Sequence, residues 1–368
     1  MKVHPTQPQY MKVTTAHPEI KITQTAASRL PEIDFDNIPF GQIFSDHMFI
    51  MDYRDGRWME PRIEPFAHIP LHPATSAIHY GQSIFEGMKA YRGQDGRGLM
   101  FRPDMNIARF NKSAHRMAMP EVPEEIFHDA LHKLLSMDQG WIPGTPGSSL
   151  YIRPFLFATE EFIGIKVAEN YRFMIITCPV GVYYPKPVNV LVAEKFVRAF
   201  PGGVGYAKAA GNYGAVMHPL RLARERGYDQ MLWLDGKEFK YAQEIGTMNV
   251  FFVTRDKVLT PSTEEGTILD GVTRDSVIHL LREKGYTVEE RPVEMSEIVE
   301  HYKAGDLLEV FGTGTAATVA QIIRLGYLGT DYDFDQANWG VSNLVKKSLE
   351  EIRYGQVEDK YGWCDYIS

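Results

Sequence analysis

One lysine stands in a stretch built almost entirely of small residues. The segment GGVGYAKAAGNYG, residues 202–214, surrounds Lys208 with five glycines, three alanines and two tyrosines. Glycine permits positive φ and close approach of other groups, so such a run can present a lysine at short range to a planar ligand. A lysine that has lost part of its water becomes a usable nucleophile and proton carrier, as Schiff-base chemistry with an aldehyde requires. The alternative is a flexible surface loop that happens to contain a lysine, and only other residues of the chain can distinguish the two interpretations.

Three further features could act together with this lysine. Glu244 follows it by 36 positions (244 − 208). The segments GVTR (271–274) and GTGTA (312–316) suit a phosphate or carboxylate, which backbone N–H groups and a helix dipole would bind. Arg109 and Arg153 lie on otherwise apolar segments, where an arginine needs an anion, an internal ion pair or several carbonyls. Each feature alone is weak evidence.

Several other chemistries lack their sequence signatures. The chain has no Walker motif and no GxGxxG opening an early strand-helix unit, so nucleotide-binding folds gain little support. Neither HExxH nor a cysteine pair with metal spacing is present, so we expect no metal site. A GxSxG elbow is also absent, which disfavours a serine hydrolase.

Composition indicates a globular cytoplasmic protein. The 368 residues are 44% hydrophobic and 23% charged, and no apolar run is long enough to span a bilayer. The net charge of −8 disfavours a nucleic-acid partner. Two cysteines, Cys178 and Cys364, suggest a reducing compartment, and the N-terminus lacks the apolar core of a secretory signal. We expect residues 1–30 to be an irregular lead-in.

The first half of the chain predicts strands and two helices that would position the arginines. A turn is expected at Asp55-Gly56, and helices are expected over about 104–117 and 124–137. The segment SLYIRPFLFA alternates as a strand does, and YRFMIITCPV is another buried strand. On the first of these strands, one face carries Tyr151, Arg153, Phe155 and Phe157.

The second half predicts the surroundings of Lys208 and Glu244. A helix is expected from about 215 to 226, followed by a strand, an Asp-Gly turn at 235–236 and two more strands, with Glu244 where the last two meet. Thr273 is the expected N-cap of a helix ended by Gly285, and a last helix is expected over 341–353. We expect a smaller N-terminal domain (1–181), a connection (182–188) and a larger C-terminal domain (189–368).

These parts together are those that pyridoxal phosphate requires: a lysine for its aldehyde, an acid for its ring nitrogen and an anion cradle for its phosphate. The sequence resembles the branched-chain aminotransferases, which are fold type IV pyridoxal-phosphate enzymes. The resemblance runs from about Pro39 to the end and rests on ordered motifs, which are YGQSIFEGMKAYRG, SLYIRPFL, KAAGNYG, EIGTMNVFFV, LDGVTRDSV and FGTGTAATV. It implies a two-domain α/β (α+β) fold with a mixed sheet or pseudo-barrel in the larger domain and the cofactor at the domain interface.

The resemblance also implies roles for individual residues. Lys208 would bind the cofactor covalently and carry the proton, Glu244 would keep the ring nitrogen protonated, and Tyr213 would contact the phenolic oxygen of the ring. The implied phosphate contacts are Arg109, the Val272 and Thr273 amides, Thr315 and Thr247. The implied substrate pocket consists of Phe85, Tyr151 and Tyr183, with Tyr80 and residues 163–165 reaching in from a second subunit. Without the resemblance, a helix salt bridge for Arg109 and core packing for the aromatic residues are the simpler readings.

The implied reaction transfers the amino group of L-leucine, L-isoleucine or L-valine reversibly to 2-oxoglutarate, and the sequence fixes no direction between biosynthesis and breakdown. Arg153 would receive the γ-carboxylate of glutamate, while the Thr315 and Ala316 amides receive the α-carboxylate. The implied assembly is a homodimer. Alternatives are a D-amino-acid aminotransferase or aminodeoxychorismate lyase of the same fold, or a non-catalytic protein that binds a phosphorylated metabolite.

Overall fold

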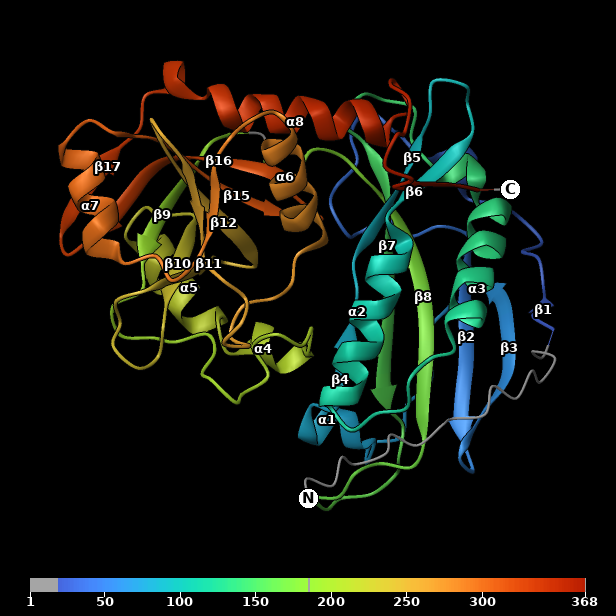
Figure 1. Cartoon of the computed structure of the whole chain (residues 1–368). Helices are drawn as coiled ribbons and strands as arrows, with labels where there is room; N and C mark the ends of the chain where they lie inside the picture. Colours follow the sequence, from blue (N-terminus) through green and yellow to red (C-terminus); the bar gives the residue numbers. More distant parts are fainter. Residues whose placement is uncertain (1–18, 185, 368) are drawn as a thin grey trace, which may run out of the picture.

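The computed structural model describes residues 19–184 and 186–367, and two mixed sheets dominate it (Figure 1). In lateral order, the first sheet contains β1 (Lys21–Ile22), β3 (Arg57–Pro65), β2 (His47–Arg54), β8 (Tyr171–Val180), β7 (Ser149–Ala158), β5 (Met88–Arg92), β6 (Gly98–Phe101) and β18 (Cys364–Tyr366), with β4 (Ser83–Phe85) paired to β7. The first lobe consists of this sheet, of α1 (Ser76–Tyr80), α2 (Pro103–Arg116) and α3 (Glu124–Met137), and of two 3-10 turns, Leu30–Glu32 and Gln139–Trp141.

The second sheet curls until it closes on itself. In lateral order it contains β11 (Ala242–Ile245), β10 (Gln230–Leu234), β9 (Val188–Val192), β16 (Thr318–Tyr327), β15 (Leu307–Gly314), β12 (Met248–Thr254), β13 (Val258–Thr260) and β14 (Val288–Glu290), with β17 (Thr330–Asp333) paired to β16. A further pairing of β11 with β12 closes the first six strands into a barrel. The predicted α/β fold with a pseudo-barrel is therefore confirmed.

The helices of the second lobe surround this barrel. They are α4 (Ala210–Gly214), α5 (Met217–Glu225), α6 (Val272–Glu283), α7 (Met295–Lys303) and α8 (Gly340–Arg353), with a 3-10 turn at Gln336–Asn338. In Figure 1, α8 lies across the top of the molecule and leads from the second lobe back to the first. The chain then ends in β18, which pairs with β6 of the first sheet.

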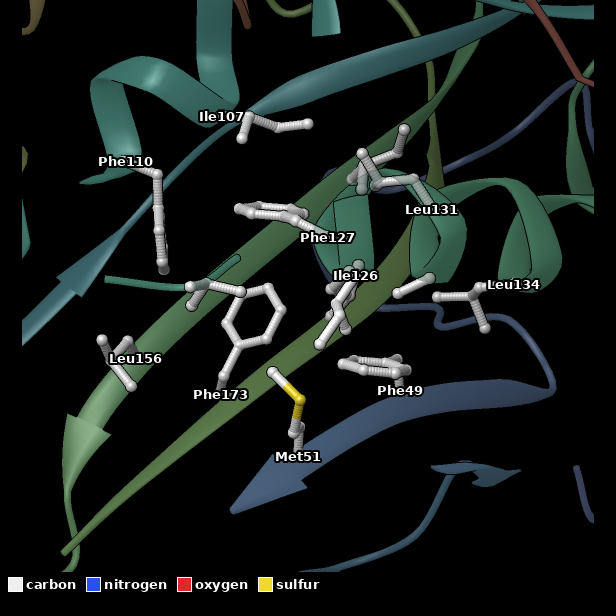
Figure 2. Packing of buried hydrophobic residues seen from close by; sticks show 14 of the residues in the cluster. Phe49, Met51, Ile107, Phe110, Ile126, Phe127, Leu131, Leu134, Leu156 and Phe173 are labelled. Atoms are coloured by element: carbon white, nitrogen blue, oxygen red, sulfur yellow. The ribbon is translucent and has the colours of Figure 1, made fainter. Parts of the chain in front are cut away.

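Helices α2 and α3 cover one face of the first sheet because each carries an apolar stripe. On α3, the stripe at helical spacing is wholly buried, and it consists of Ile126, Phe127, Ala130, Leu131, Leu134 and Leu135. Figure 2 shows Ile126, Phe127, Leu131 and Leu134 of this stripe facing side chains of the sheet. The Phe127 ring lies 5.3 Å from that of Phe110 on α2 and 4.7 Å from that of Phe173 on β8. Both predicted helices are confirmed to within a residue at either end.

The two Asp-Gly pairs that were predicted to form turns behave differently. Asp55 (φ 50°) and Gly56 (φ 72°) form the tight turn predicted between β2 and β3. The turn predicted at 235–236 does join the antiparallel strands β10 and β11, but it extends beyond these two residues. The Asp235 carboxylate accepts hydrogen bonds from four backbone N–H groups, those of Lys237, Glu238, Lys240 and Tyr241. It therefore organises a wider loop between β10 and β11.

The predicted domains were continuous in sequence, but both ends of the described chain lie in the first sheet. Residues 1–18 lie outside the described residues, and the expected irregular lead-in contains β1, which pairs in parallel with β3. The predicted connection, 182–188, lies between β8 of the first sheet and β9 of the second, and its last residue, Val188, begins β9; residue 185 is outside the described part. The last strand, β18, lies in the first sheet, so we propose the expected domains with residues 364–366 assigned to the first lobe.

Two expectations about composition can be compared with the described residues. Cys178 and Cys364 are both free thiols. Within residues 19–184 and 186–367, no helix has the length and apolar character needed to cross a membrane.

Candidate active site

Lys208 lies two residues before α4, where hydrogen bonds from the first lobe hold its backbone. Its N–H donates to Ser113 Oγ of α2 (2.9 Å), and its carbonyl accepts the N–H of Phe85 (3.1 Å). The Lys208 amine donates to Tyr213 Oη (3.2 Å) and lies 5.1 Å from the centre of the Phe85 ring. The predicted lysine and tyrosine are therefore neighbours, and the backbone contacts fix where the amine can reach.

One glycine before Lys208, Gly205, allows close packing. A Cβ on Gly205 would lie 2.6 Å from the carbonyl oxygen of Thr267, a contact that real side chains do not make. The same carbonyl accepts a hydrogen bond from Arg198, so the backbone on which this segment packs is itself held in place. Small residues are thus required here by the approach of a neighbouring chain segment.

Glu244 lies at the end of β11, as predicted, and it is buried. Its Oε2 is 2.8 Å from Nη2 of Arg198, and its Oε1 accepts the N–H of Leu269 (3.0 Å). Burial raises the pKa of Glu244 above its ordinary value, while the charge of Arg198 and the Leu269 hydrogen bond oppose that rise. Glu244 shares a cavity with Tyr213 and Thr247, two further predicted site residues.

Arg198 is a site residue that the sequence analysis missed. Its guanidinium is buried beside Glu244 and also donates to the Gly205 carbonyl (3.3 Å), so it joins the acid to the glycine-rich segment. The only signal in the sequence was an arginine four positions before Gly202. No local pattern relates that arginine to an acid 46 positions later (244 − 198).

Arg109 makes a buried ion pair with Glu86, which the sequence analysis also missed. Nε and Nη2 of Arg109 donate to the two carboxylate oxygens of Glu86 (2.7 and 2.9 Å), and Nη1 donates to the Asp270 carbonyl (2.9 Å). Burial would raise the pKa of Glu86, but the charge and hydrogen bonds of Arg109, together with the charge of Lys208, hold it below its ordinary value. Arg109 is thus an oriented cation that retains further N–H groups.

The start of α6 offers backbone N–H groups without a capping side chain. Thr273, the predicted N-cap, lies one residue inside the helix; the N-cap is Gly271, and no side chain caps the helix. A Cβ on Gly271 would come within 2.0 Å of Asn249 Oδ1, which explains why a capping side chain cannot occupy this position. The N–H groups of the first turn, including those of Val272 and Thr273, are therefore free to bind an anion.

Two buried cations face the same region as these N–H groups. A cavity is lined by Val272, Thr273 and Thr315 together with Lys89 and Arg353. Arg353 donates to Thr273 Oγ1 (3.3 Å), its Nε is buried without a hydrogen-bond partner in the described part of the chain, and no ion pair with a carboxylate is observed there for either cation. Buried, unneutralised cations beside an uncapped helix start favour a bound anion.

Lys89 connects this cavity to the predicted carboxylate loop. Its amine donates to the carbonyl of Ala316 (2.9 Å), and burial, with the nearby charge of Arg353, lowers the pKa of Lys89 from 10.5 to about 7. The predicted GTGTA loop is shorter than expected, because Gly312 to Gly314 belong to β15. Only Thr315 to Ala317 form the turn, and the Lys89 amine fixes its middle residue.

The predicted aromatic wall is partly assembled. The ring of Phe85 lies 4.7 Å from that of Tyr213, and the guanidinium of Arg153 lies 4.7 Å from the Phe85 ring and 5.3 Å from the Tyr151 ring. Nη2 of Arg153 donates to Tyr151 Oη (3.2 Å), while its Nε is buried without a partner among the described residues. Arg153 therefore offers an unused donor within the aromatic wall.

The third predicted wall residue, Tyr183, and the residues predicted to reach in from a second subunit lie farther from this group. Tyr183 reaches it through Phe40, a residue the sequence analysis missed, whose ring is 4.8 Å from Tyr183 and 5.6 Å from Tyr151. Tyr80 lies on α1, is 43% exposed and has its ring beside that of His79. Residues 163–165 are also on the surface, with Ile165 95% exposed. Within one chain, the structure does not bring Tyr80 or this loop into contact with Lys208.

The residues present fit the expected cofactor. The amine of Lys208 beside Tyr213 can react with its aldehyde, Glu244 lies where it could pair with a ring nitrogen, with the Arg198 charge favouring its ionised form, and the uncapped start of α6 can bind a phosphate. A phosphate near Thr315 would also neutralise Lys89 and Arg353. Each part of pyridoxal phosphate has a matching group that is already oriented.

Comparison with known proteins agrees with this arrangement. Residues 83–325 match the family described as amino-transferase class IV. The chain is 46% identical to branched-chain-amino-acid transaminase 1 of Bacillus subtilis (strain 168), covering 90% of this chain and 94% of the relative. It is 40% identical to a branched-chain-amino-acid aminotransferase of Mycobacterium tuberculosis (strain CDC 1551 / Oshkosh), covering 88% and 90%.

The fold is similar to that of solved branched-chain amino acid aminotransferases. The enzyme from Escherichia coli superposes with a TM-score of 0.72 at 24% identity and covers 88% of this chain and 99% of that chain. The enzyme from Thermobaculum terrenum, solved in its PLP-form (holo-form), gives a TM-score of 0.70 at 22% identity, covering 89% of this chain and 100% of that chain.

Lys89 predicts a dependence of stability on pH. Its folded pKa of about 7 lies below the ordinary 10.5, so the unfolded chain binds more protons between these values. The free energy of unfolding should therefore rise with pH across this window, by up to about 1.4 kcal/mol per pH unit from this group. Lys89→Met should lack that component, and urea unfolding of both proteins at several pH values would measure it.

Because a bound phosphate would favour the charged amine, the comparison should be made without added cofactor. Lys133→Met is the matched control, since Lys133 is an exposed lysine on α3 that pairs with Asp129. It should follow the wild-type profile. If Lys89→Met also kept the wild-type rise with pH, the amine at position 89 would not be the titrating group.

Proposed function

Because this chain belongs to the class IV aminotransferases, and among them to the branched-chain-amino-acid aminotransferases, we propose that it transfers the amino group of L-leucine, L-isoleucine or L-valine to 2-oxoglutarate. The products are the branched 2-oxo acid and L-glutamate, and the reaction is reversible. The observation that carries this proposal is the position of Lys208, whose amine lies beside Tyr213 and the Phe85 ring and whose backbone is held by two residues of the first lobe, Ser113 and Phe85.

We propose that pyridoxal 5'-phosphate is the cofactor; when bound, it supplies an electron-withdrawing ring that stabilises the negative charge left on the substrate Cα. Lys208 would hold it covalently, Tyr213 and Glu244 would contact its ring, and Arg109, Thr247, Thr315 and the first N–H groups of α6 would hold its phosphate. The Arg198 guanidinium beside Glu244 supports this assignment because its charge favours the ionised carboxylate. An ionised Glu244 can accept a hydrogen bond from a protonated ring nitrogen.

The lysine amine then has a second task. Once released, Nζ of Lys208 would accept the proton from Cα of the amino acid and act as general base. Tyr213 Oη orients the amine through their hydrogen bond, and the backbone contacts to Ser113 and Phe85 limit its reach. The Phe85 ring excludes water from one side of the amine, which strengthens its electrostatic interactions.

One pocket must accept both an aliphatic side chain and the γ-carboxylate of glutamate. We propose that Phe85, Tyr151 and Tyr183 contact the aliphatic side chain and that Arg153 binds the γ-carboxylate. The unpaired Nε of Arg153 supports this division, because a carboxylate would satisfy it. The α-carboxylate of either substrate would bind the amides of Thr315 and Ala316.

We further propose a cytoplasmic homodimer in which Tyr80 and residues 163–165 of one subunit complete the pocket of the other. The support is the exposure of these side chains: Ile163 is 68% and Ile165 95% exposed, although both are apolar. The free thiols of Cys178 and Cys364 are consistent with a reducing compartment.

An amino-donor panel with 2-oxoglutarate as acceptor tests the proposed substrates. L-Leucine, L-isoleucine and L-valine should each yield glutamate, about 100-fold or more faster than D-alanine, because the wall of aromatic rings binds an aliphatic side chain of one configuration. Glutamate formation is the measurement. Preference for D-alanine would instead favour a D-amino-acid aminotransferase, and an inactive, colourless protein that takes up no pyridoxal phosphate would defeat the proposal.

Covalent trapping tests the proposed role of Lys208. The purified protein should be yellow, and borohydride should remove that absorption and leave the label on the peptide that contains Lys208. Lys208→Ala should lower turnover by roughly 10⁴-fold while the protein stays folded, since both the attachment point and the base are lost. Peptide mapping by mass spectrometry locates the label, and a label on any other lysine contradicts the assignment.

Replacement of Arg153 tests how the pocket accepts two substrates. Arg153→Ala should lower kcat/KM for glutamate by roughly 10- to 100-fold, the value of a charged hydrogen bond, and should affect leucine less. Arg153→Lys keeps the charge, so its kcat/KM for glutamate should lie between those of the wild type and Arg153→Ala. Single-turnover measurements with each amino acid separate the half-reactions. Equal losses for leucine and glutamate, in a variant that still binds cofactor, would rule out this division of labour.

A further inference from the structure

A group of potential metal ligands lies on the outer side of the first lobe, where helix α3 meets the C-terminal strand β18. His128 and His132 are one turn apart on α3, so their rings lie on the same face, with centroids 4.5 Å apart. The Nε2 atoms of both histidines lie 2.9 Å from Oδ2 of Asp365 on β18. Among the described residues, this is the one group whose histidine, cysteine or carboxylate atoms could hold a metal ion together.

The elements that present these three side chains are fixed by contacts elsewhere. The opposite face of α3 carries the buried stripe that includes Phe127 and Leu131, so His128 and His132 must point away from the core. Asp365 pairs with Met100 of β6, and the N–H of Ile367 donates to the Gly98 carbonyl (2.9 Å). The convergence therefore follows from the fold, since residues 128 and 365 are 237 positions apart.

We propose that His128, His132 and Asp365 bind a divalent transition-metal ion of the Zn²⁺ type, which joins α3 to the C-terminal strand. Two imidazole nitrogens and one carboxylate oxygen are the donors that zinc accepts, and its fourth position would be filled by water. The two nitrogens disfavour Mg²⁺ and Ca²⁺, which prefer oxygen ligands.

The geometry requires only a small adjustment. With metal–ligand bonds of about 2.0–2.2 Å, tetrahedral ligand atoms lie roughly 3.3 Å apart. The three ligand atoms here all lie within 4.8 Å of one another, and each histidine nitrogen is 2.9 Å from the shared oxygen. Widening these hydrogen bonds by a few tenths of an ångström makes room for the ion. The His128 side chain is 48% exposed, so it can rotate and the ion can enter from solvent.

The bound ion would strengthen an attachment that is otherwise short. Strand β18 has three residues and is the last strand at its edge of the sheet. Strand β18 follows α8, the last helix of the second lobe. Its pairing with β6 therefore attaches the end of the chain to the first lobe. A metal ion bonded to both α3 and β18 would hold this connection closed, at a place that includes none of the proposed substrate contacts.

Zinc titration of the cofactor-loaded enzyme tests the proposal. After treatment with a chelator and dialysis, calorimetry with Zn²⁺ alone should show one ion per chain with a Kd on the order of 1 µM. His128→Gln and Asp365→Asn should each weaken binding by roughly 100-fold, while aminotransferase activity is retained. Both variants keep side chains of similar shape and hydrogen-bonding groups, so folding should not be the cause.

His115→Gln is the matched control, because His115 is an exposed histidine on α2 that takes no part in this group. It should bind Zn²⁺ as the wild type does. Hydrogen exchange gives a second readout: Zn²⁺ should slow exchange of the amides in residues 364–366 by about 10-fold in the wild type and not in His128→Gln. The proposal is overturned if the wild type binds no Zn²⁺, or if His128→Gln and Asp365→Asn bind it as tightly as the wild type.

Discussion

The buried ion pair of Glu86 and Arg109 is the interaction on which the site depends. Glu86 follows β4, Arg109 lies on α2, and the guanidinium continues to the Asp270 carbonyl just before α6, so one side chain connects the two lobes. Isolated charges at this depth would be costly, which makes the pair effective only in this geometry. Its position fixes β4, whose Phe85 N–H holds the carbonyl of Lys208. The Lys208 amine, which we propose as the reactive group, is therefore positioned through an ion pair in which it takes no part.

A second constraint is the excess of positive charge around the start of α6. Arg109 is neutralised by Glu86, and Arg198 by Glu244, but Lys89 and Arg353 are buried without a carboxylate partner in the described part of the chain. The lowered pKa of Lys89 is a consequence of this excess, because burial and the charge of Arg353 both disfavour the protonated amine. A phosphate would relieve both cations, so the site is prepared for an anion at the expense of local stability.

Local patterns in the sequence predicted the helices, turns and strands whose formation depends on residues close together in the chain. The stripe of α3, the Asp55-Gly56 turn and the alternation of β7 follow from spacing alone, and all three are observed. The missed residues act through partners distant in sequence: Arg198 with Glu244 and Glu86 with Arg109. Thr273 was misplaced because a sequence pattern cannot reveal that Asn249 leaves no room for a side chain at Gly271. The resemblance supplied the expected roles, and the structure supplied the side chains that hold them.

The turn at residues 315–317 shows why the two lobes act as one unit. It belongs to the barrel, but Lys89 of the first sheet donates to the Ala316 carbonyl, and Arg353 at the end of α8 donates to Thr318 at the start of β16. The amides proposed to bind the α-carboxylate are thus oriented by a residue of the other lobe. Arg353 also ends the helix from which the chain turns back to β18 and the first sheet. Movement of one lobe relative to the other would therefore disturb the carboxylate site before it exposed the buried core, because a single hydrogen bond yields more easily than a packed interface.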